Sequence, residues 1–154
     1  MSPRPVQRWR VELIREGTVV YQHLSSVEQV IEHFAFLRSQ TVETLYVAFL
    51  DTRNRIIGEQ EVARGTLNQI TVHPRDIFQA AILANCTSIL LAHNHPSGDC
   101  TPSKEDRALT QQVAQAGELL GIQVLDHVII GDPESYSFLE AGELKQARRR
   151  KAAD

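Results

Sequence analysis

The spacing of hydrophobic residues changes from strand-like to helical within the first third of the chain. The segment RWRVELIREGTVVYQ alternates and predicts two short strands around a turn at Glu16–Gly17. Ser25 or Ser26 can then cap a helix through SSVEQVIEHFAFLRS, because apolar residues recur there on one helical face: Val27, Val30, Ile31, Phe34 and Leu37. We expect residues 1–40 to form a strand pair and a helix that pack on the remainder of the domain.

A hairpin and a second helix are predicted next. An almost continuous apolar strand over residues 45–50 leads into a turn at Asp51–Asn54, and a returning strand covers residues 55–63. Pro74 lies where a helix is expected to begin, and the pattern continues to about Asn85.

The second half of the chain alternates between strands and helices. A short apolar strand over residues 88–92 ends at His93, and Ser103 can cap a third helix that Gly121 is expected to end. Further strands are predicted over residues 122–130 and, briefly, 135–139. This alternation predicts an α/β fold with a mixed sheet flanked by helices.

Composition limits the class of protein without identifying it. The 154 residues are 42% hydrophobic and 23% charged, with no internal repeat or linker, which predicts one structural domain. The net charge of −3 does not favour a general nucleic-acid-binding surface. No apolar run reaches the ~18–20 residues of a membrane span, and the start has no secretory hydrophobic region. With only Cys86 and Cys100, no disulfide framework is expected, so we predict a reduced, cytoplasmic protein without membrane contact.

The stretch LAHNHPSGDCTPSKED, residues 91–106, has the spacing of a metal site. His93 and His95 are two residues apart, so in an extended segment both side chains point the same way and can reach one ion. The loop that follows can fold back and bring Asp106 to them. Two histidines and one aspartate leave a fourth tetrahedral position for water, which is the arrangement of catalytic zinc. Zinc is favoured by ligand type, with other divalent ions as alternatives.

The sequence allows more than one role for the polar residues near these candidate ligands. A zinc-bound water needs a carboxylate base close to the metal but not bound to it. Ser103 can donate a hydrogen bond to a developing oxyanion, serve only as the helix cap, or do both. Cys100 is either a partly exposed thiol without a role or an inhibitory fourth ligand. Asp126 and His127 are expected to give structural support at most.

These residues resemble a known metalloprotease motif. His93-Asn94-His95-Pro96, followed after six intervening residues by Ser103 and then by Asp106, resembles the JAMM (MPN+) motif. Five longer segments resemble the RadC-type JAB domain: RGTLN at 64–68, VHPRDIF at 72–78, AHNHPSGD at 92–99, PSKED at 102–106 and VLDHVIIG at 124–131. The resemblance covers about residues 40–142 and implies a JAB/MPN core over residues 41–142, with a cytidine-deaminase-like architecture.

The resemblance also implies a site and a reaction. One Zn²⁺ per chain is expected on His93, His95 and Asp106, with Ser103 stabilising the tetrahedral intermediate. The general base of the family begins the first core strand, which by position is Glu43; Glu59 and Glu61 are competitors by residue type. The implied function is a zinc-dependent hydrolase that cleaves an amide or isopeptide bond in a peptide or protein conjugate.

The sequence is also compatible with other functions. Full-length RadC-type proteins carry an N-terminal helix-hairpin-helix region. Because a strand pair and one helix are predicted at the start of this chain instead, we expect a stand-alone form of the domain. The basic tail at 143–154 contains ARRRK and can give a weak nucleic-acid contact, with Arg4, Arg8 and Arg10 adding to it. The alternative function is a DNA-repair-associated or mobile-element accessory protein without peptidase activity. A purely structural zinc is a third alternative, whereas the sequence does not favour a deaminase, because H-x-E and P-C-x-x-C do not occur.

Overall fold

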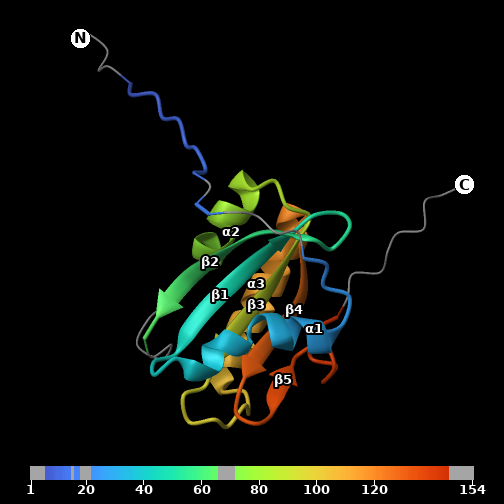
Figure 1. The fold of residues 1–154 in the computed structure, drawn as a ribbon. Helices are drawn as coiled ribbons and strands as arrows, with labels where there is room; N and C mark the ends of the chain where they lie inside the picture. The colour runs from blue at the N-terminus through green and yellow to red at the C-terminus, as the bar shows by residue number, and fades with distance from the viewer. Residues whose placement is uncertain (1–5, 15, 18–21, 66–71, 146–154) are drawn as a thin grey trace, which may run out of the picture.

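One mixed sheet organises the chain, with helices on both of its faces (Figure 1). The computed structural model describes residues 6–14, 16–17, 22–65 and 72–145. The strands lie in the order β2-β1-β3-β4-β5, and only β3 and β4 run parallel. Their bounds are β1 Thr44–Leu50, β2 Ile56–Arg64, β3 Ser88–Asn94, β4 Gln123–Ile130 and β5 Ser135–Ser137. The helices are α1 Val27–His33, the 3₁₀ helix η1 Ala35–Ser39, α2 Pro74–Leu83 and α3 Lys104–Leu120. The predicted α/β fold with a mixed sheet is confirmed.

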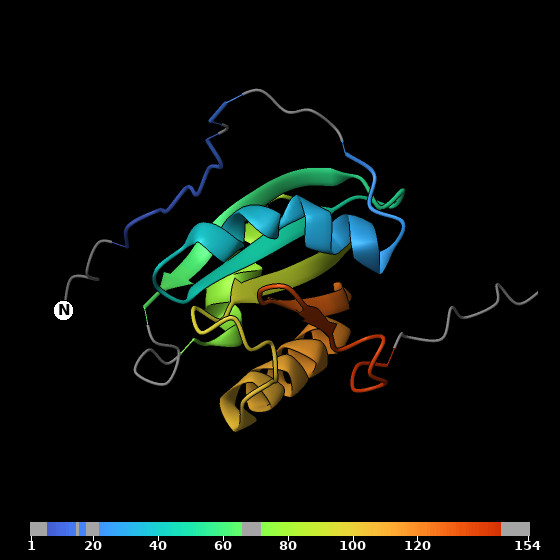
Figure 2. The same cartoon turned by 60° about the horizontal axis from the view of Figure 1, so that its bottom comes forward.

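The two faces of the sheet are covered by different helices because side chains alternate along each strand. Val47 of β1 and Leu91 of β3 belong to a hydrophobic cluster with α2 and α3. Their neighbours Ala48 and Leu90 belong to a second cluster with α1 and η1. Figure 2 shows α1 and α3 on opposite sides of the sheet. Both faces of β1 and β3 are therefore buried, which is why these strands read as continuous apolar runs.

The predicted N-terminal strand pair is wrong for its first strand. Residues 6–14 form no strand and run clear of the sheet in both views, with Trp9 85% exposed (Figures 1 and 2). Residues 18–21 of the second predicted strand lie outside the described residues. Near its end, a bridge between His23 and Arg55 pairs the chain with the start of β2. Alternation alone does not hold a strand pair together, since an isolated hairpin that buries no face is marginally stable.

The predicted first helix is present but divided into two segments. Ser26, rather than Ser25, is the N-cap, and its hydroxyl accepts the N–H of Gln29. The α-helix ends at His33 and continues as η1. Phe34 and Leu37 are fully buried and three residues apart, the spacing that a 3₁₀ turn brings onto one face.

The end of β3 and the loop after it determine where the histidines lie. β3 continues one residue beyond His93 and stays paired with β4, so that His93 is opposite Ile129. The loop then returns along the end of β4, where His95 N–H donates to the carbonyl of Ile130 and Asp132 N–H donates to that of Gly98. Among the described helices, none is long and apolar enough to cross a membrane, and the predicted cytoplasmic location stays a prediction.

Gly131 is expected to be necessary for this loop contact. A Cβ added at Gly131 meets the carbonyl oxygens of Glu134 and Gly98 and lies 2.9 Å from Cys100 Cβ. Gly131→Ala should therefore lower the free energy of unfolding by about 1–3 kcal/mol, because overpacking forces neighbouring atoms to shift. The control is Gly58→Ala, where the added Cβ makes an ordinary 3.5 Å contact with Phe49. Urea denaturation of both variants tests this, and equal unfolding midpoints would contradict it.

Candidate metal centre

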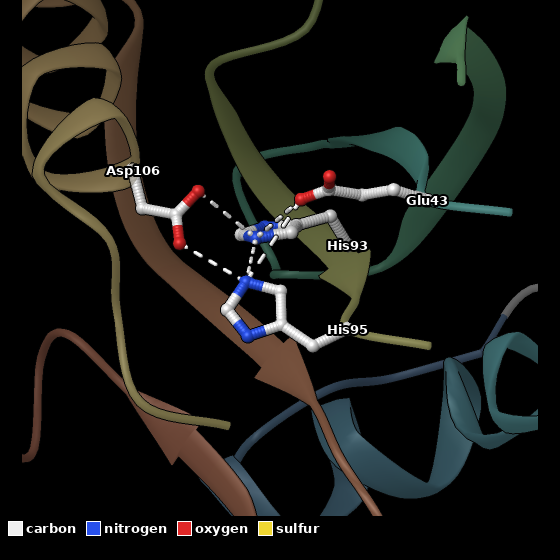
Figure 3. A group of neighbouring side chains, drawn as sticks. All are labelled: Glu43, His93, His95 and Asp106. Atoms are coloured by element: carbon white, nitrogen blue, oxygen red, sulfur yellow. Dashed lines mark hydrogen bonds and ion pairs between the residues drawn. The ribbon is translucent and has the colours of Figure 1, made fainter. Parts of the chain in front are cut away.

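Two histidine rings converge where β3 ends (Figure 3). The Nε2 atoms of His93 and His95 lie 3.1 Å apart. His93 is fully buried, whereas His95 is partly exposed in the loop after the strand. The Nδ1 atom of His95 lies 2.7 Å from the carbonyl oxygen of Asp99. A carbonyl can only accept, so this contact places a proton on Nδ1 of His95 and leaves Nε2 to face His93.

Asp106 meets both rings from the first turn of α3. Its Oδ1 lies 3.2 Å from Nε2 of His93, and its Oδ2 lies 3.1 Å from Nε2 of His95. The side chain is held by its own helix start, because Ser103 N–H donates to Oδ2 and Asp106 N–H donates to Ser103 Oγ. This reciprocal capping box fixes the carboxylate on the same helix turn that begins α3.

The ionisation of Asp106 is strongly perturbed. Burial opposes a charge on this carboxylate, but hydrogen bonds from His93 and His95 outweigh that effect and hold the pKa of Asp106 far below its usual value. In turn, the hydrogen bond with Asp106 raises the pKa of His95, against the opposing effect of burial. The centre thus brings together an ionised oxygen ligand and two imidazole nitrogens.

The spacing of these atoms fits one tetrahedral ion. Ligand atoms about 2.0–2.1 Å from zinc in a tetrahedral site lie roughly 3.3 Å from one another. The three contacts among His93, His95 and Asp106 are 3.1–3.2 Å long. Within the described ranges, a group able to hold a metal ion consists of these residues and Glu43. Cys100 does not belong to this group, and its side chain packs against the cluster under α2 and α3.

Glu43 approaches the histidines from the opposite side to Asp106 (Figure 3). Its Oε1 lies 3.7 Å from Nε2 of His93 and 3.9 Å from Nε2 of His95, farther than the three closer ligands lie from one another. The residue directly precedes β1, and its carbonyl accepts the N–H of Gly65. Glu59 and Glu61 make ion pairs elsewhere, with His33 and Arg64. Of the three carboxylates considered from sequence, Glu43 is the one at the centre.

Asn94 has a structural role that the sequence did not reveal. Lying between the two histidines, it points to the other face of the sheet, where its Oδ1 accepts the N–H of Thr44 at 2.8 Å. Its Nδ2 donates to the carbonyls of Val42 and Gln40 at 3.1 and 3.4 Å. One side chain therefore holds the backbone on both sides of Glu43. The position between the two ligands was the available signal, but its partners are about 50 residues away.

Ser103 fulfils the predicted capping role. Its Oγ accepts the N–H of Asp106 at 3.0 Å, which leaves the hydroxyl proton available to a ligand. Its predicted contact with an oxyanion stays a prediction. The ARRRK run at 147–151 in the basic tail, Arg4 and the end of the RGTLN segment lie outside the described residues. The nucleic-acid contact and the accessory function therefore also stay predictions.

His127 supports the centre more directly than the sequence indicated. Its Nε2 lies 2.7 Å from Nδ1 of His93, and its Nδ1 lies 2.6 Å from the hydroxyl of Thr110. Complete burial lowers the pKa of His127 well below its usual value, so the ring is neutral. Asp126 fixes the backbone here by accepting the N–H groups of His127 and Leu139. Sequence spacing gave no sign of Thr110.

Replacing Asn94 should loosen the segment that carries Glu43. In Asn94→Ala the buried N–H of Thr44 loses its acceptor, so the free energy of unfolding should fall by about 1–3 kcal/mol. Hydrogen exchange at the Thr44 amide should become faster, while exchange at Val128 in the middle of β4 should change only with the global stability. If the exchange rate at Thr44 relative to Val128 stays the same, Asn94 does not fix the backbone at Thr44 and the prediction is wrong.

Comparison with known proteins agrees with this geometry. A UPF0758 protein of Pelobacter propionicus is 48% identical over 121 residues, covering 78% of this chain and 53% of the relative. A UPF0758 protein of Staphylococcus haemolyticus is 49% identical over 106 residues, covering 69% of this chain and 46% of the relative. The chain spans about half the length of these curated relatives, and their names state no activity.

A family match covers most of the described core. Residues 24–144 match the RadC-like JAB domain. This range runs from the segment before α1 to a point beyond β5, and it contains all four residues of the group that could hold a metal ion. The resemblance seen in the five sequence segments is thereby confirmed, and the chain belongs to the RadC-like JAB domain family.

Proposed function

We propose that this protein is a zinc-dependent hydrolase that cleaves an amide or isopeptide bond in a peptide or protein conjugate. The observation that carries the proposal is the asymmetry of the centre. The three contacts among the Nε2 atoms of His93 and His95 and the two carboxylate oxygens of Asp106 are 3.1–3.2 Å long, whereas the Glu43 carboxylate is 3.7–3.9 Å from the two rings. This spacing suits three ligands and one nearby base, rather than four equivalent ligands that close a structural site.

Each group then has a chemical task. When bound, zinc supplies a Lewis acid that lowers the pKa of its water to ~7 and polarises a carbonyl group. Oε1 of Glu43 accepts a proton from the attacking water and later returns it to the leaving amine. The Ser103 hydroxyl, whose oxygen already accepts from Asp106, donates its proton toward the developing oxyanion.

The proposed class of substrate, an amide, is supported by the task of the base. A leaving amine is a poor leaving group unless it is protonated, so a single carboxylate that takes a proton and returns it suits amide cleavage. JAB-domain families include metalloproteases, which supports the same class. The side chain of Glu43 is 16% exposed, so the carboxylate is shielded yet reachable from solvent.

Removing the charge of Glu43 should separate binding of the ion from catalysis. Glu43→Gln should keep one zinc per chain but lose about 10²–10⁴-fold in turnover, since general acid–base catalysis supplies that factor. The matched control is Glu61→Gln, which changes a carboxylate paired with Arg64 and should leave turnover unchanged. Zinc content is measured by elemental analysis. Turnover is measured as release of new amino groups from a panel of peptides and lysine-linked peptide conjugates.

The outcomes of this experiment distinguish the roles of Glu43. Loss of zinc from Glu43→Gln would make Glu43 a ligand and contradict its assignment as a base. Full turnover by Glu43→Gln would remove it from the mechanism. A zinc-loaded parent protein that releases no amino group from any member of the panel would contradict the proposed amide or isopeptide class.

A further inference from the structure

The ring of His127 lies directly behind His93, on the side away from Asp106 and His95. Both histidines are fully buried, and their facing nitrogens are 2.7 Å apart. Phe138 stacks on the His127 ring, with centroids 5.0 Å apart and planes at 13°. With its backbone held by Asp126 and its ring held by Phe138, His127 offers His93 a partner in a fixed position.

A short chain of hydrogen bonds connects His93 through this ring to α3. Nδ1 of His127 lies 2.6 Å from Oγ1 of Thr110, and that hydroxyl lies 2.7 Å from the backbone carbonyl of Asp106. Thr110 is one helical turn after Asp106 and is itself buried. Asp106 therefore has two roles: its carboxylate lies at the centre, and its backbone carbonyl oxygen accepts the last hydrogen bond of this series.

The carbonyl determines the direction of every bond in the chain. A carbonyl oxygen has no proton, so the single hydroxyl proton of Thr110 must point to it. Oγ1 of Thr110 must then accept from Nδ1 of His127. The ring nitrogens of the buried His127 contact a hydroxyl and an imidazole rather than a carboxylate, so the ring carries one proton, and that proton is on Nδ1. Nε2 of His127 is left with a lone pair and accepts the Nδ1 proton of His93.

We propose that Thr110 and His127 are positioning residues that keep a proton on Nδ1 of His93 and so leave its Nε2 as the atom that binds the metal. This inference concerns the metal centre of the proposed function and extends it beyond the ligands themselves. In His95, a single contact with the carbonyl of Asp99 keeps the proton on Nδ1. His93 is buried inside the sheet, and its Nδ1 reaches a carbonyl only through two intervening side chains.

The reverse arrangement shows what these residues prevent. If Nε2 of His127 donated to Nδ1 of His93, a neutral His93 would carry its proton on Nε2, where the metal must bind. Nδ1 of His127 would then need the hydroxyl proton of Thr110, and the 2.7 Å contact with the carbonyl of Asp106 would have no proton. Binding an ion would require all three groups to change donors and acceptors together.

A matched pair of substitutions at Thr110 tests the proposal without any substrate. Thr110→Val keeps the shape of the side chain but removes the hydroxyl, whereas Thr110→Ser keeps the hydroxyl. Zinc affinity is measured by competition with a chromophoric chelator at constant pH. Thr110→Val should bind zinc about 10–100-fold more weakly, the usual effect of removing a partner behind a metal ligand, and Thr110→Ser should stay close to the parent protein.

The second measurement is made on the zinc-free protein. Long-range ¹⁵N–¹H correlation spectra show which imidazole nitrogens carry protons, and Nδ1 of His93 should be protonated in the parent protein and in Thr110→Ser, whether or not Nε2 also donates to Asp106. In Thr110→Val this preference should be lost. A parent His93 without a proton on Nδ1, or equal zinc affinity in the valine and serine variants, would overturn the proposal.

Substitutions at His127 provide the check if Thr110→Val does not fold. His127→Gln retains an amide oxygen that can accept from Nδ1 of His93, whereas His127→Leu does not, so the glutamine variant should bind zinc more tightly. Equal affinities in this pair would also overturn the proposal. Because these readouts need no turnover, an inactive parent protein would count against the proposed hydrolase and leave the test of Thr110 and His127 intact.

Discussion

The buried carboxylate of Asp106 is the constraint on which the rest of the centre depends. With 2% of its surface exposed, it is stable as an anion only if charged or donating groups surround it. The start of α3 supplies the Ser103 N–H, and the end of β3 together with its loop supplies two imidazoles. The parallel pairing of β3 with β4 and the packing of α3 on β4 bring these groups together at the C-terminal end of β3.

Alternation along a strand divides the work of three consecutive residues. His93 and His95 turn toward α3 and meet Asp106, while Asn94 turns to the other face and holds the segment on either side of Glu43. A period of two therefore places the candidate metal ligands on one face and the support for the candidate base on the other. The same tripeptide fixes both halves of the centre relative to each other.

The sequence was informative where a pattern is local. Buried strands, the Ser103 cap and the ligand spacing all arise from residues close in the chain, and the described elements follow them closely. The contact between Thr110 and His127 could not be predicted, because a threonine inside a helix meets a strand histidine 17 residues later only after folding. The N-terminal strand failed for the opposite reason: its local alternation is clear, but residues 6–14 bury none of it.

The central claim is that His93, His95 and Asp106 bind one zinc ion and leave a position for water. Zinc-edge X-ray absorption on protein loaded with one zinc per chain tests this most directly. The account predicts about four nitrogen and oxygen neighbours at ~2.0–2.1 Å, with the outer-shell scattering of two imidazoles and no sulfur. A sulfur neighbour near ~2.3 Å, or a protein that retains no zinc, would contradict it.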